Sequence, residues 1–421
     1  MANRKILYVI LDGLGDDPHP NLDGKTPLEA AHTPHLDSLA KKGRSGTVVT
    51  VGEGIAPESD IAVFAILGYD PHTQHAGRGP LEALGAGLEM RDGDLAWRAN
   101  FATVDENNKL IDRRAGRDLS TEEAKKLADA INEAVKLQAA EATFLATSEH
   151  RGALHIRADI PLSSEISNSD PAYERRGSLG IALETFEPYP KRTEPLDDSD
   201  GARHGADLTN EWSDQAQQAL QDHDVNHERE KRRRPPANIV LVRDAGDHIP
   251  RVTSLREKFG LRFACFAEMP VEVGIAKVTG MDPILIDPGT DAAAYARLAE
   301  RTVEALDGYD ALYVHIKGPD VPAHDGRAED KRDVIAAIDA GYFGTLLPEL
   351  NKGVIVAVTA DHSTSCVRKA HTADPVPLVI AGGPLSGDGT RAYSESDAAS
   401  GSLKRLRGVD IMPMLVDIAR S

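Results

Sequence analysis

Three short apolar segments, each followed closely by acidic or histidine residues, constrain most strongly what this chain can fold into. They read ILYVIL at 6–11, LYVHI at 312–316 and VIVAV at 354–358. Unbroken apolar and β-branched runs of this length are typical of parallel strands buried on both faces. In open α/β sheets, ligands bind just beyond the carboxyl ends of such strands. We therefore expect the residues after these three runs to share one site.

The residues that follow the runs are aspartates and histidines, the mixture of oxygen and nitrogen donors that Zn²⁺ or Mn²⁺ prefers. In chain order they are Asp12, Asp320, His324, Asp361, His362 and His371. Any one of them alone is more simply explained as a turn aspartate or a surface histidine. Three acid-bearing strand ends together with the histidines favour a metal site.

The spacing of these residues divides them into two groups. Asp320 and His324 are separated by one helical turn, so their side chains would lie on one face, and His371 can supply a third ligand. Asp12 with the adjacent pair Asp361 and His362 would form the second group. Two divalent cations a few ångströms apart can clamp the attacking and leaving oxygens of a phosphoryl transfer.

Ser59 is the best candidate nucleophile. It stands at or just before the start of a predicted helix, SDIAVFAIL, which follows a predicted strand at 47–51. A serine hydroxyl needs a base or a metal to remove its proton, and helix N-terminal N–H groups can hold a phosphate. An ordinary helix N-cap is the commoner role for such a serine. Beside the acid and histidine groups we favour the nucleophile, which can fill both roles.

Composition excludes several classes of partner. The net charge of −19 argues against nucleic acid and anionic membranes, whereas a small anionic substrate stays compatible because salt screens the global field. No segment approaches a membrane span, and the run at 6–11 is too short for a secretion signal. Cys265 and Cys366 suit a reducing compartment. We expect a cytoplasmic protein, and the sequence allows a homo-oligomer without predicting one.

The length of 421 residues predicts two domains. A strand at 101–104, a helix that opens with the capping box of Ser120 and Glu123, and strands at 143–146 and 153–156 form a β–α–β–β unit that could pack by itself. We predict an inserted α+β cap domain at 96–159.

Residues 1–95 and 160–421 are predicted to form the catalytic domain. Its fold class is α/β, because strands and helices alternate at both ends of the chain, and the sheet is mainly parallel and flanked by helices. The strand at 239–242 is expected to begin the second run of this alternation.

Longer motifs occur in order along nearly the whole chain. They are VILDGLGD, TPLEAAHTPHLDSLAKKG, SDIAVFAILGYDP, GRGPLEALGAG, NFATVDENNKLIDRRAGR, PPANIVLVR, HIKGPDVPAHDG, TADHSTS and AHTADPVP. Together they resemble the archaeal-type branch of the 2,3-bisphosphoglycerate-independent (cofactor-independent) phosphoglycerate mutases, in the alkaline phosphatase superfamily. The resemblance implies an alkaline-phosphatase-like sheet and a metal-dependent isomerase of glycolysis and gluconeogenesis that uses no 2,3-bisphosphoglycerate.

The resemblance also implies a division of labour among the site residues. One cation would be bound by Asp320, His324 and His371, and a second by Asp12, Ser59, Asp361 and His362. Mn²⁺ is the expected metal, with Zn²⁺, Co²⁺ and Mg²⁺ as alternatives. Ser59 would take the phosphate from 3-phosphoglycerate, glycerate would reorient while the cap encloses it, and the phosphate would return to the 2-hydroxyl.

Two other functions remain open at this point. A related metal-dependent phosphotransferase or phosphatase, for example one resembling a homoserine kinase, would use the same fold and metals on another small metabolite. A non-catalytic metal-binding or phosphate-binding protein is the third possibility.

The residues that contact the substrate are less sharply indicated. Candidates for binding its anionic groups are Arg243, Lys317 and Arg151, and candidates for handling a hydroxyl or a proton are Asp170 and His150. Each can equally be an ordinary surface charge. Glu58 and Asp244 stand where relatives often have glycine, and the segment beginning at Glu272 lacks an arginine that relatives often carry.

Overall fold

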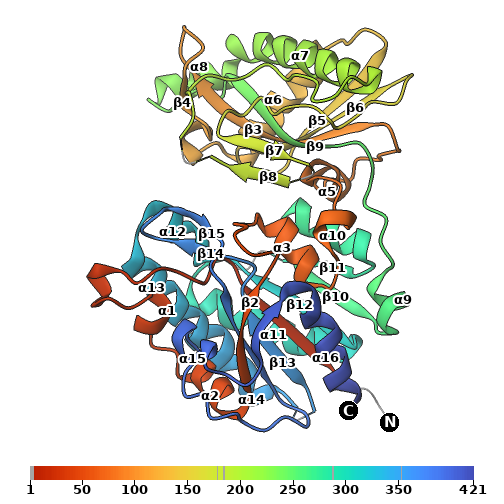
Figure 1. Cartoon of the computed structure of the whole chain (residues 1–421). Helices are drawn as coiled ribbons and strands as arrows, with labels where there is room; N and C mark the ends of the chain where they lie inside the picture. Colours follow the sequence, from red (N-terminus) through yellow and green to blue (C-terminus); the bar gives the residue numbers. More distant parts are fainter. Residues whose placement is uncertain (1–3, 178, 184, 287–288, 352) are drawn as a thin grey trace. The chain divides into compact units, whose positions relative to one another are not determined.

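The computed structural model describes residues 4–177, 179–183, 185–286, 289–351 and 353–421 (Figure 1). The chain divides into two compact units. Unit 1 contains Met1–Thr73, Val252–Glu268 and Thr279–Ser421, and unit 2 contains Gln74–Arg251 and Met269–Val278.

Unit 1 is built on an eight-stranded sheet, counted over the described residues, in the order β11-β10-β12-β1-β13-β16-β2-β17. β16 is antiparallel to both of its neighbours, and the other strand pairs are parallel. This confirms the predicted α/β class with a mainly parallel sheet. The strands are β1 (Ile6–Leu11), β2 (Arg44–Val49), β10 (Phe263–Ala267), β11 (Asp282–Leu285), β12 (Ala311–Ile316), β13 (Ile355–Thr359), β16 (Val376–Ala381) and β17 (Lys404–Arg407).

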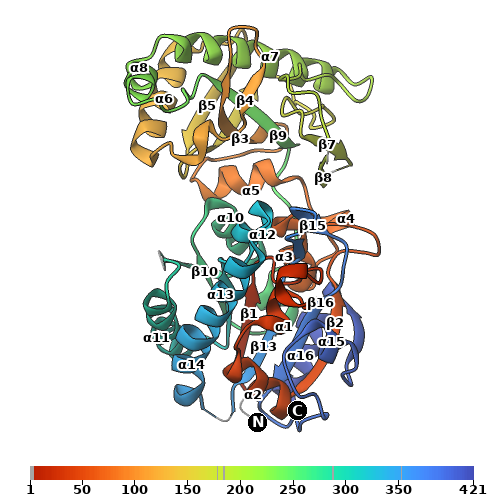
Figure 2. The ribbon, with the colours of Figure 1, turned by 90° about the vertical axis from the view of Figure 1, so that its left-hand side faces the viewer.

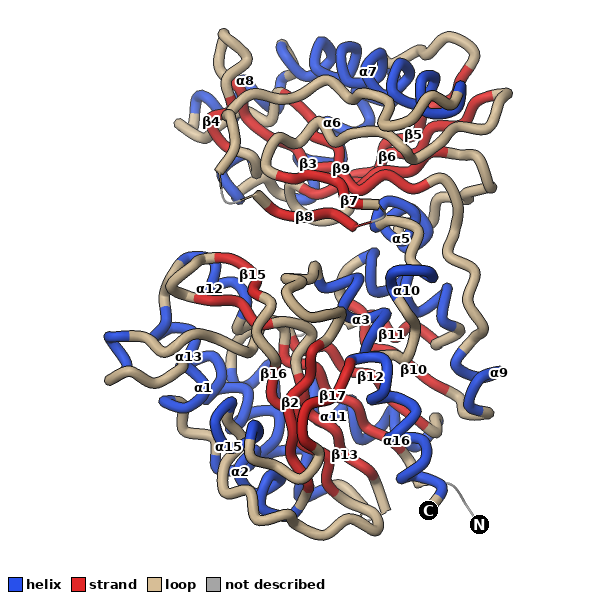
Figure 3. The backbone as a smooth tube through the Cα atoms, in the orientation of Figure 1, coloured by secondary structure: helices blue, strands red, loops and turns tan. Residues whose placement is uncertain are grey.

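Helices flank this sheet, with α2 and α13 on one side of it and α16 on the other (Figure 3). The longer α-helices of unit 1 are α2 (Pro34–Lys42), α3 (Ser59–Ile66), α11 (Ala292–Gly308), α13 (Ala328–Ile338) and α16 (Ile411–Arg420). Shorter ones are α1 (Pro27–Ala30), α9 (Leu255–Phe259), α12 (Asp320–Asp325), α14 (Gly344–Glu349) and α15 (Glu395–Ala399), and a small hairpin joins β14 (Ser363–Ser365) to β15 (Ala370–Thr372). α4 (Pro71–Gln74) lies where the chain passes from one unit to the other.

The three apolar runs of the sequence are the central strands of this sheet. β1 is fully buried and pairs in parallel with β12 on one side and β13 on the other. Because the three strands are neighbours that run in the same direction, their carboxyl ends meet at one edge of the sheet. α3, α12 and the β14–β15 hairpin lie at that edge (Figure 2).

Local signals set the helix starts only in part. Thr26 and Glu29 form a capping box at the start of α1, with Pro27 at its first position. At α2, however, Thr33 makes no side-chain cap. The buried carboxylate of Asp339 instead accepts hydrogen bonds from the first-turn N–H groups of His35 and Leu36. This cap comes from a distant part of the chain and leaves no local sequence signal.

Unit 2 is organised around an antiparallel sheet in the order β4-β3-β6-β5, with β9 pairing along β3. Its strands are β3 (Leu95–Val104), β4 (Leu110–Asp112), β5 (Ala140–Ala146), β6 (Arg151–Ala158) and β9 (Ile239–Gly246), with β7 (Tyr173–Arg176) and β8 (Leu179–Ala182) in a separate hairpin. Its helices are α5 (Arg78–Gly85), α6 (Thr121–Ala134), α7 (Asp200–Gln221), α8 (Asp224–Lys231) and α10 (Pro270–Thr279). The capping box of Ser120 and Glu123 opens α6 as predicted.

The predicted insertion at 96–159 covers only part of unit 2. β9 was expected to begin the second α/β run of the catalytic domain, and this is wrong, because β9 belongs to unit 2 and pairs antiparallel with β3. α7 packs against α6, and the Trp212 ring lies 5.5 Å from the Phe144 ring within the apolar core of the unit. An apolar run shows that a strand is buried but not which sheet it joins. No helix in the described ranges is both long enough and apolar enough to cross a membrane.

Candidate metal centre

The acidic and histidine residues that follow the three central strands converge at one edge of the unit 1 sheet. The structure contains three overlapping groups, and within each group one donor atom per residue lies within 4.8 Å of the others: Asp320, His324 and His371; Asp12, Asp320 and His362; Asp12, His315 and Asp361. Because Asp12 and Asp320 each occur in two groups, the donors form one continuous centre rather than separate sites.

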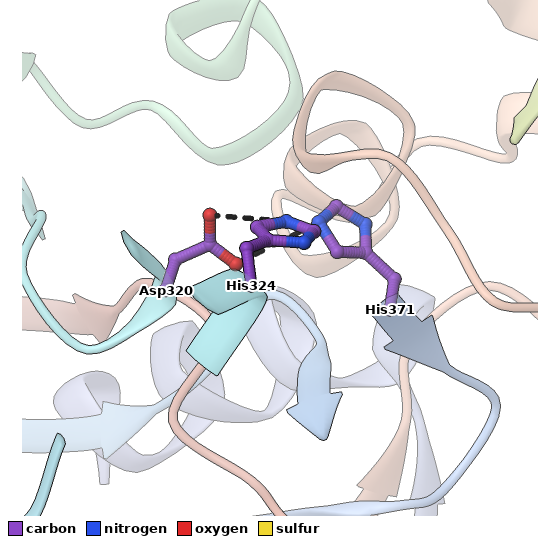
Figure 4. A group of neighbouring side chains, drawn as sticks. All are labelled: Asp320, His324 and His371. Atoms are coloured by element: carbon purple, nitrogen blue, oxygen red, sulfur yellow. Dashed lines mark ion pairs between the residues drawn. The ribbon is translucent and has the colours of Figure 1, made fainter. Parts of the chain in front are cut away.

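The first group combines α12 with the β14–β15 hairpin. Asp320 and His324 lie one turn apart on α12, with 3.5 Å between Asp320 Oδ2 and His324 Nε2. His371 on β15 approaches the other carboxylate oxygen, with 3.7 Å between its Nε2 and Asp320 Oδ1. Figure 4 shows both imidazoles beside the carboxylate. The half-buried side chains could hold a cation that remains open to a ligand.

The second group predicted from the sequence, Asp12, Asp361 and His362, is more deeply buried than the first. His362 Nε2 lies 3.2 Å from Asp361 Oδ2 and 3.6 Å from Asp12 Oδ1. Among the residues that the structure describes, no hydrogen-bond donor reaches either of these two buried carboxylate oxygens. Buried carboxylates are costly without a positive partner, so the group fits a divalent cation. The ring of His362 stacks on that of His371 at 3.7 Å, which joins this group to the first.

All three imidazoles of the two groups are oriented through Nδ1. His371 Nδ1 lies 2.8 Å from the Pro57 carbonyl oxygen, and His324 Nδ1 lies 3.1 Å from that of Lys369. A carbonyl can only accept, so Nδ1 carries a hydrogen in both rings, and in the neutral form of each ring Nε2 is the atom with the lone pair. His362 Nδ1 lies 3.0 Å from the Thr364 hydroxyl. Such bonds are typical of histidines whose other nitrogen binds a metal.

Charges within the centre shift its pKa values in opposite directions. Burial alone would raise the pKa of Asp12, but Lys317 and the surrounding histidines hold it well below its usual range. Burial and the neighbouring Asp12 carboxylate raise the pKa of Asp361. Burial lowers the pKa of His362, which favours its neutral form. A neutral imidazole beside carboxylates is the form that can donate a lone pair to a cation.

The centre also includes His315, which lies on β12, and Lys317, which directly follows that strand. His315 Nε2 lies 3.6 Å from Asp361 Oδ2 and 3.9 Å from Asp12 Oδ2, and sequence reasoning did not select it. Its signal was a histidine inside an apolar run. Lys317, predicted to bind substrate, places Nζ 3.3 Å from Asp12 Oδ2. It therefore lies beside the second group.

Ser59 is the first residue of α3 and does not cap it. The N-cap position belongs to Glu58, whose side chain makes no capping hydrogen bond. The Ser59 hydroxyl lies 3.2 Å from His362 Nε2 instead. Ser59 therefore lies at the edge of the second group and is not the N-cap residue of its helix.

The other predicted substrate residues lie in unit 2. Arg243 stacks on the Tyr173 ring at 3.5 Å and bonds the neighbouring Asp244 at 3.1 Å. Asp170 is fully buried and accepts two bonds from Arg113, at 2.9 and 2.6 Å. A carboxylate held in this way is a firm partner for an arginine, and its predicted role toward a substrate hydroxyl stays a prediction.

His150 lies among arginines. Burial and the charges of nearby guanidinium groups lower its pKa to about 3. Four arginines are responsible, and we call them the arginine cluster: Arg98, Arg114, Arg117 and Arg151. Arg151 was predicted to bind an anion, whereas the other three were not selected, although the motif DRRAGR is visibly basic.

Comparison with known proteins identifies the family. The family model of 2,3-bisphosphoglycerate-independent phosphoglycerate mutase matches residues 40–226. The mutase of that name from Aeropyrum pernix is 44% identical over 96% of this chain and 96% of its own length. The chain belongs to the archaeal-type family of 2,3-bisphosphoglycerate-independent phosphoglycerate mutases. A second member, from Methanocaldococcus jannaschii, is 38% identical over 99% of this chain and 98% of its own.

Solved structures of similar chains agree with membership of the mutase family. The cofactor-independent phosphoglycerate mutase from Thermoplasma acidophilum is 34% identical, with a TM-score of 0.64 over 99% of this chain and 100% of its own. The PH0037 protein from Pyrococcus horikoshii is 31% identical, with a TM-score of 0.80 over 100% of this chain and 98% of its own. The whole chain, including both units, therefore corresponds to proteins of this type.

Three residues that the sequence analysis singled out, Asp244, Glu272 and Glu58, have local roles in the structure. Asp244 has φ +58°, a left-handed conformation that glycine adopts easily and aspartate tolerates better than most residues. Glu272 accepts a hydrogen bond from the Met269 N–H at the start of α10, so its carboxylate stabilises a helix terminus. Glu58 acts electrostatically on His362, where its negative charge favours the protonated imidazole.

Proposed function

We propose that this chain interconverts 3-phosphoglycerate and 2-phosphoglycerate through a phosphoserine formed at Ser59. One observation carries the proposal: the Ser59 hydroxyl lies 3.2 Å from His362 Nε2, at the edge of the buried carboxylates Asp12 and Asp361. In a member of the phosphoglycerate mutase family, this is the position from which a serine can attack a bound phosphate.

We further propose that the centre holds two divalent cations. Asp320, His324 and His371 would hold one, and Asp12, Ser59, Asp361 and His362 the other. Cations at these places would stabilise the charge on the transferring phosphoryl group. The mixed carboxylate and imidazole donors suit Mn²⁺, and also Zn²⁺, Co²⁺ or Mg²⁺.

The residues of the chain account for the transfer itself. In the forward half, Ser59 Oγ forms a bond to phosphorus while the ester bond to glycerate breaks, and the serine proton ends on the released glycerate oxygen. In the return half, the other glycerate hydroxyl attacks phosphoserine and gives its proton back to Ser59. No water enters, because hydrolysis of phosphoserine would turn the mutase into a phosphatase. We propose that unit 2 serves as the cap that excludes water.

Positive charge in unit 2 supports this role for the cap. The arginine cluster concentrates positive charge around a neutral histidine, in a chain whose net charge is −19. The backbone there is strained at two non-glycine residues, since Ala115 and Arg117 have φ of +46° and +54°. Strained residues persist where the surrounding structure holds them, often at ligand sites. We propose that the cluster and Arg243 bind the carboxylate or phosphate of the substrate.

The decisive experiment follows the position of phosphate. Protein loaded with Mn²⁺ is given 3-phosphoglycerate, and ³¹P NMR is expected to show 2-phosphoglycerate without added 2,3-bisphosphoglycerate. Ser59→Ala should lower turnover by about 10⁴-fold or more, since it removes the nucleophile. Ser400→Ala, at an exposed serine after α15, should change nothing.

Two results would contradict the proposal. Free phosphate without 2-phosphoglycerate would indicate a phosphatase, the alternative function that the same centre could support. Unchanged turnover in Ser59→Ala would remove phosphoserine from the mechanism.

A further inference from the structure

The hydroxyl of Thr364 contacts one candidate ligand from each half of the metal centre. Thr364 Oγ1 lies 2.7 Å from Asp320 Oδ1, which belongs to the first group. The same oxygen lies 3.0 Å from His362 Nδ1, which belongs to the second. Thr364 is fully buried on β14, so water does not compete for these contacts.

The hydrogens available on Thr364, Asp320 and His362 determine which atom donates in each of the two contacts. A threonine hydroxyl has a single hydrogen, and an ionised carboxylate can only accept. The hydroxyl therefore donates to Asp320 and accepts from the Nδ1–H of His362. In the neutral imidazole, Nε2 then carries a lone pair, and this atom lies 3.2 Å from both Ser59 Oγ and Asp361 Oδ2.

Backbone and side-chain contacts hold Thr364 in place from three directions. Its N–H donates to the Gly15 carbonyl at 2.9 Å, and its own carbonyl accepts from Lys331 Nζ at 2.8 Å. Gly13, at φ +62°, packs against the hydroxyl, because a Cβ there would lie 2.6 Å from Thr364 Oγ1 and 2.8 Å from Asp320 Oδ1. The glycine after Asp12 thus leaves room for the bridge between the two groups.

His324 and His371 of the first group bond to backbone carbonyls through Nδ1, and side-chain substitution cannot remove these carbonyls. At His362 the acceptor is a side chain that also bonds Asp320. This histidine is therefore the one whose orientation depends on a residue able to connect the two groups.

We propose that Thr364 is a positioning residue that holds His362 in its Nδ1–H tautomer and orients Asp320 at the same time, so that the two halves of the centre bind metal in a coupled way. The metal-binding part of the proposal rests on the proposed function, whereas the tautomer of His362 is a property of the metal-free chain.

Three variants separate the role of the hydroxyl from that of the side-chain shape. Thr364→Val keeps the shape and removes the hydroxyl, and Thr364→Ser keeps the hydroxyl. Thr302→Val removes an equally buried hydroxyl on α11, outside the metal centre.

The first test measures ¹⁵N chemical shifts of the His362 ring in metal-free protein at a pH where the imidazole is neutral. Wild type, Thr364→Ser and Thr302→Val are expected to show hydrogen on Nδ1, and Thr364→Val is expected to lose this preference. Hydrogen on Nε2 in wild type, or the same tautomer in Thr364→Val, would overturn the proposal whatever the enzyme catalyses.

The second test titrates Zn²⁺ and Mn²⁺ into each variant by calorimetry. Thr364→Val should weaken binding by about 10- to 100-fold at both steps, the usual loss when a partner of a metal ligand is removed, while Thr364→Ser and Thr302→Val retain it. Loss confined to one step would refute the coupling, and unchanged affinity would refute the positioning role. A wild type that binds neither metal would count instead against the proposed function.

Discussion

His150 illustrates how surroundings alone can determine the charge of a residue. It is buried, and Arg151 and Arg114 are the arginines that most strongly oppose its protonation. With a pKa of about 3 it is neutral at physiological pH in the absence of a bound anion. An anion on the arginine cluster would raise this pKa, so a proton-handling role for His150 requires that substrate arrive first.

We expect His150 to make the folded state less stable as pH falls. The unfolded chain binds a proton on this side chain near pH 6.5 and the folded chain near pH 3, so the unfolded state binds more protons between these values. Its contribution to the free energy of unfolding therefore decreases by up to about 1.4 kcal/mol per pH unit on acidification through this window. Urea unfolding at several pH values measures it.

Substitution isolates this contribution from that of the carboxylates. His150→Gln should flatten the pH dependence between pH 6.5 and 4, whereas His227→Gln, at an exposed histidine of the same unit, should leave it unchanged. Parallel curves for wild type and His150→Gln would show that the histidine is protonated in the folded state.

At the scale of elements, a buried ion pair ties together the segments that carry the metal centre. Lys331 on α13 donates to Asp16 Oδ2 at 2.9 Å, to the Gly15 carbonyl at 3.0 Å and to the Thr364 carbonyl at 2.8 Å. Both charged side chains are inaccessible to solvent. Asp16 also accepts from the Cys366 N–H at 2.9 Å, so the loop after β1 is joined to the β14–β15 hairpin.

Breaking this ion pair should destabilise unit 1 strongly. Lys331→Met leaves Asp16 as an unpaired buried charge and should lower the free energy of unfolding by about 3–5 kcal/mol. The double variant with Asp16→Asn should lose less than the sum of the single variants, because each removes the same interaction. Chemical denaturation measures these values, with Arg332→Met at a surface pair expected to behave as wild type. Additive losses would show that the two residues act independently.

The hairpin explains why His371 reaches the centre. Pairing of β14 with β15 places His371 directly opposite Thr364, although neither strand was predicted. Three-residue strands of polar composition carry no periodic signal. Sequence reasoning selected His371 as a third ligand, and only the register of the hairpin shows how its side chain reaches the centre.

At the scale of the whole molecule, bound metal should raise the free energy of unfolding and slow hydrogen exchange only in the segments that carry the metal centre. At a free Mn²⁺ concentration of 100 times Kd, mass action adds about 2.7 kcal/mol to the free energy of unfolding for each site. Hydrogen exchange should slow after β1, in α12 and in the β14–β15 hairpin, and should remain unchanged at the arginine cluster. Asp320→Ala, which removes a ligand of the first group, should reduce both effects. Equal protection of all segments would place the metal elsewhere.

The division into two units was the least predictable part of the fold. Local patterns identified the β–α–β–β segment and the start of α6 at Ser120. They did not reveal that β9, far along the chain, completes the same sheet by pairing with β3. Strand pairing depends on contacts between distant segments, and a buried apolar run is compatible with either sheet.

The sequence by itself determined the three central strands and the acids and histidines at their ends, because apolar runs and chain order are local properties. Tertiary structure alone decided that Thr364 links the two halves of the centre, that His315 lies between Asp12 and Asp361, and that Arg98, Arg114 and Arg117 gather around His150. Distances between side chains arise from strand register and packing, and these exist only once the chain has folded.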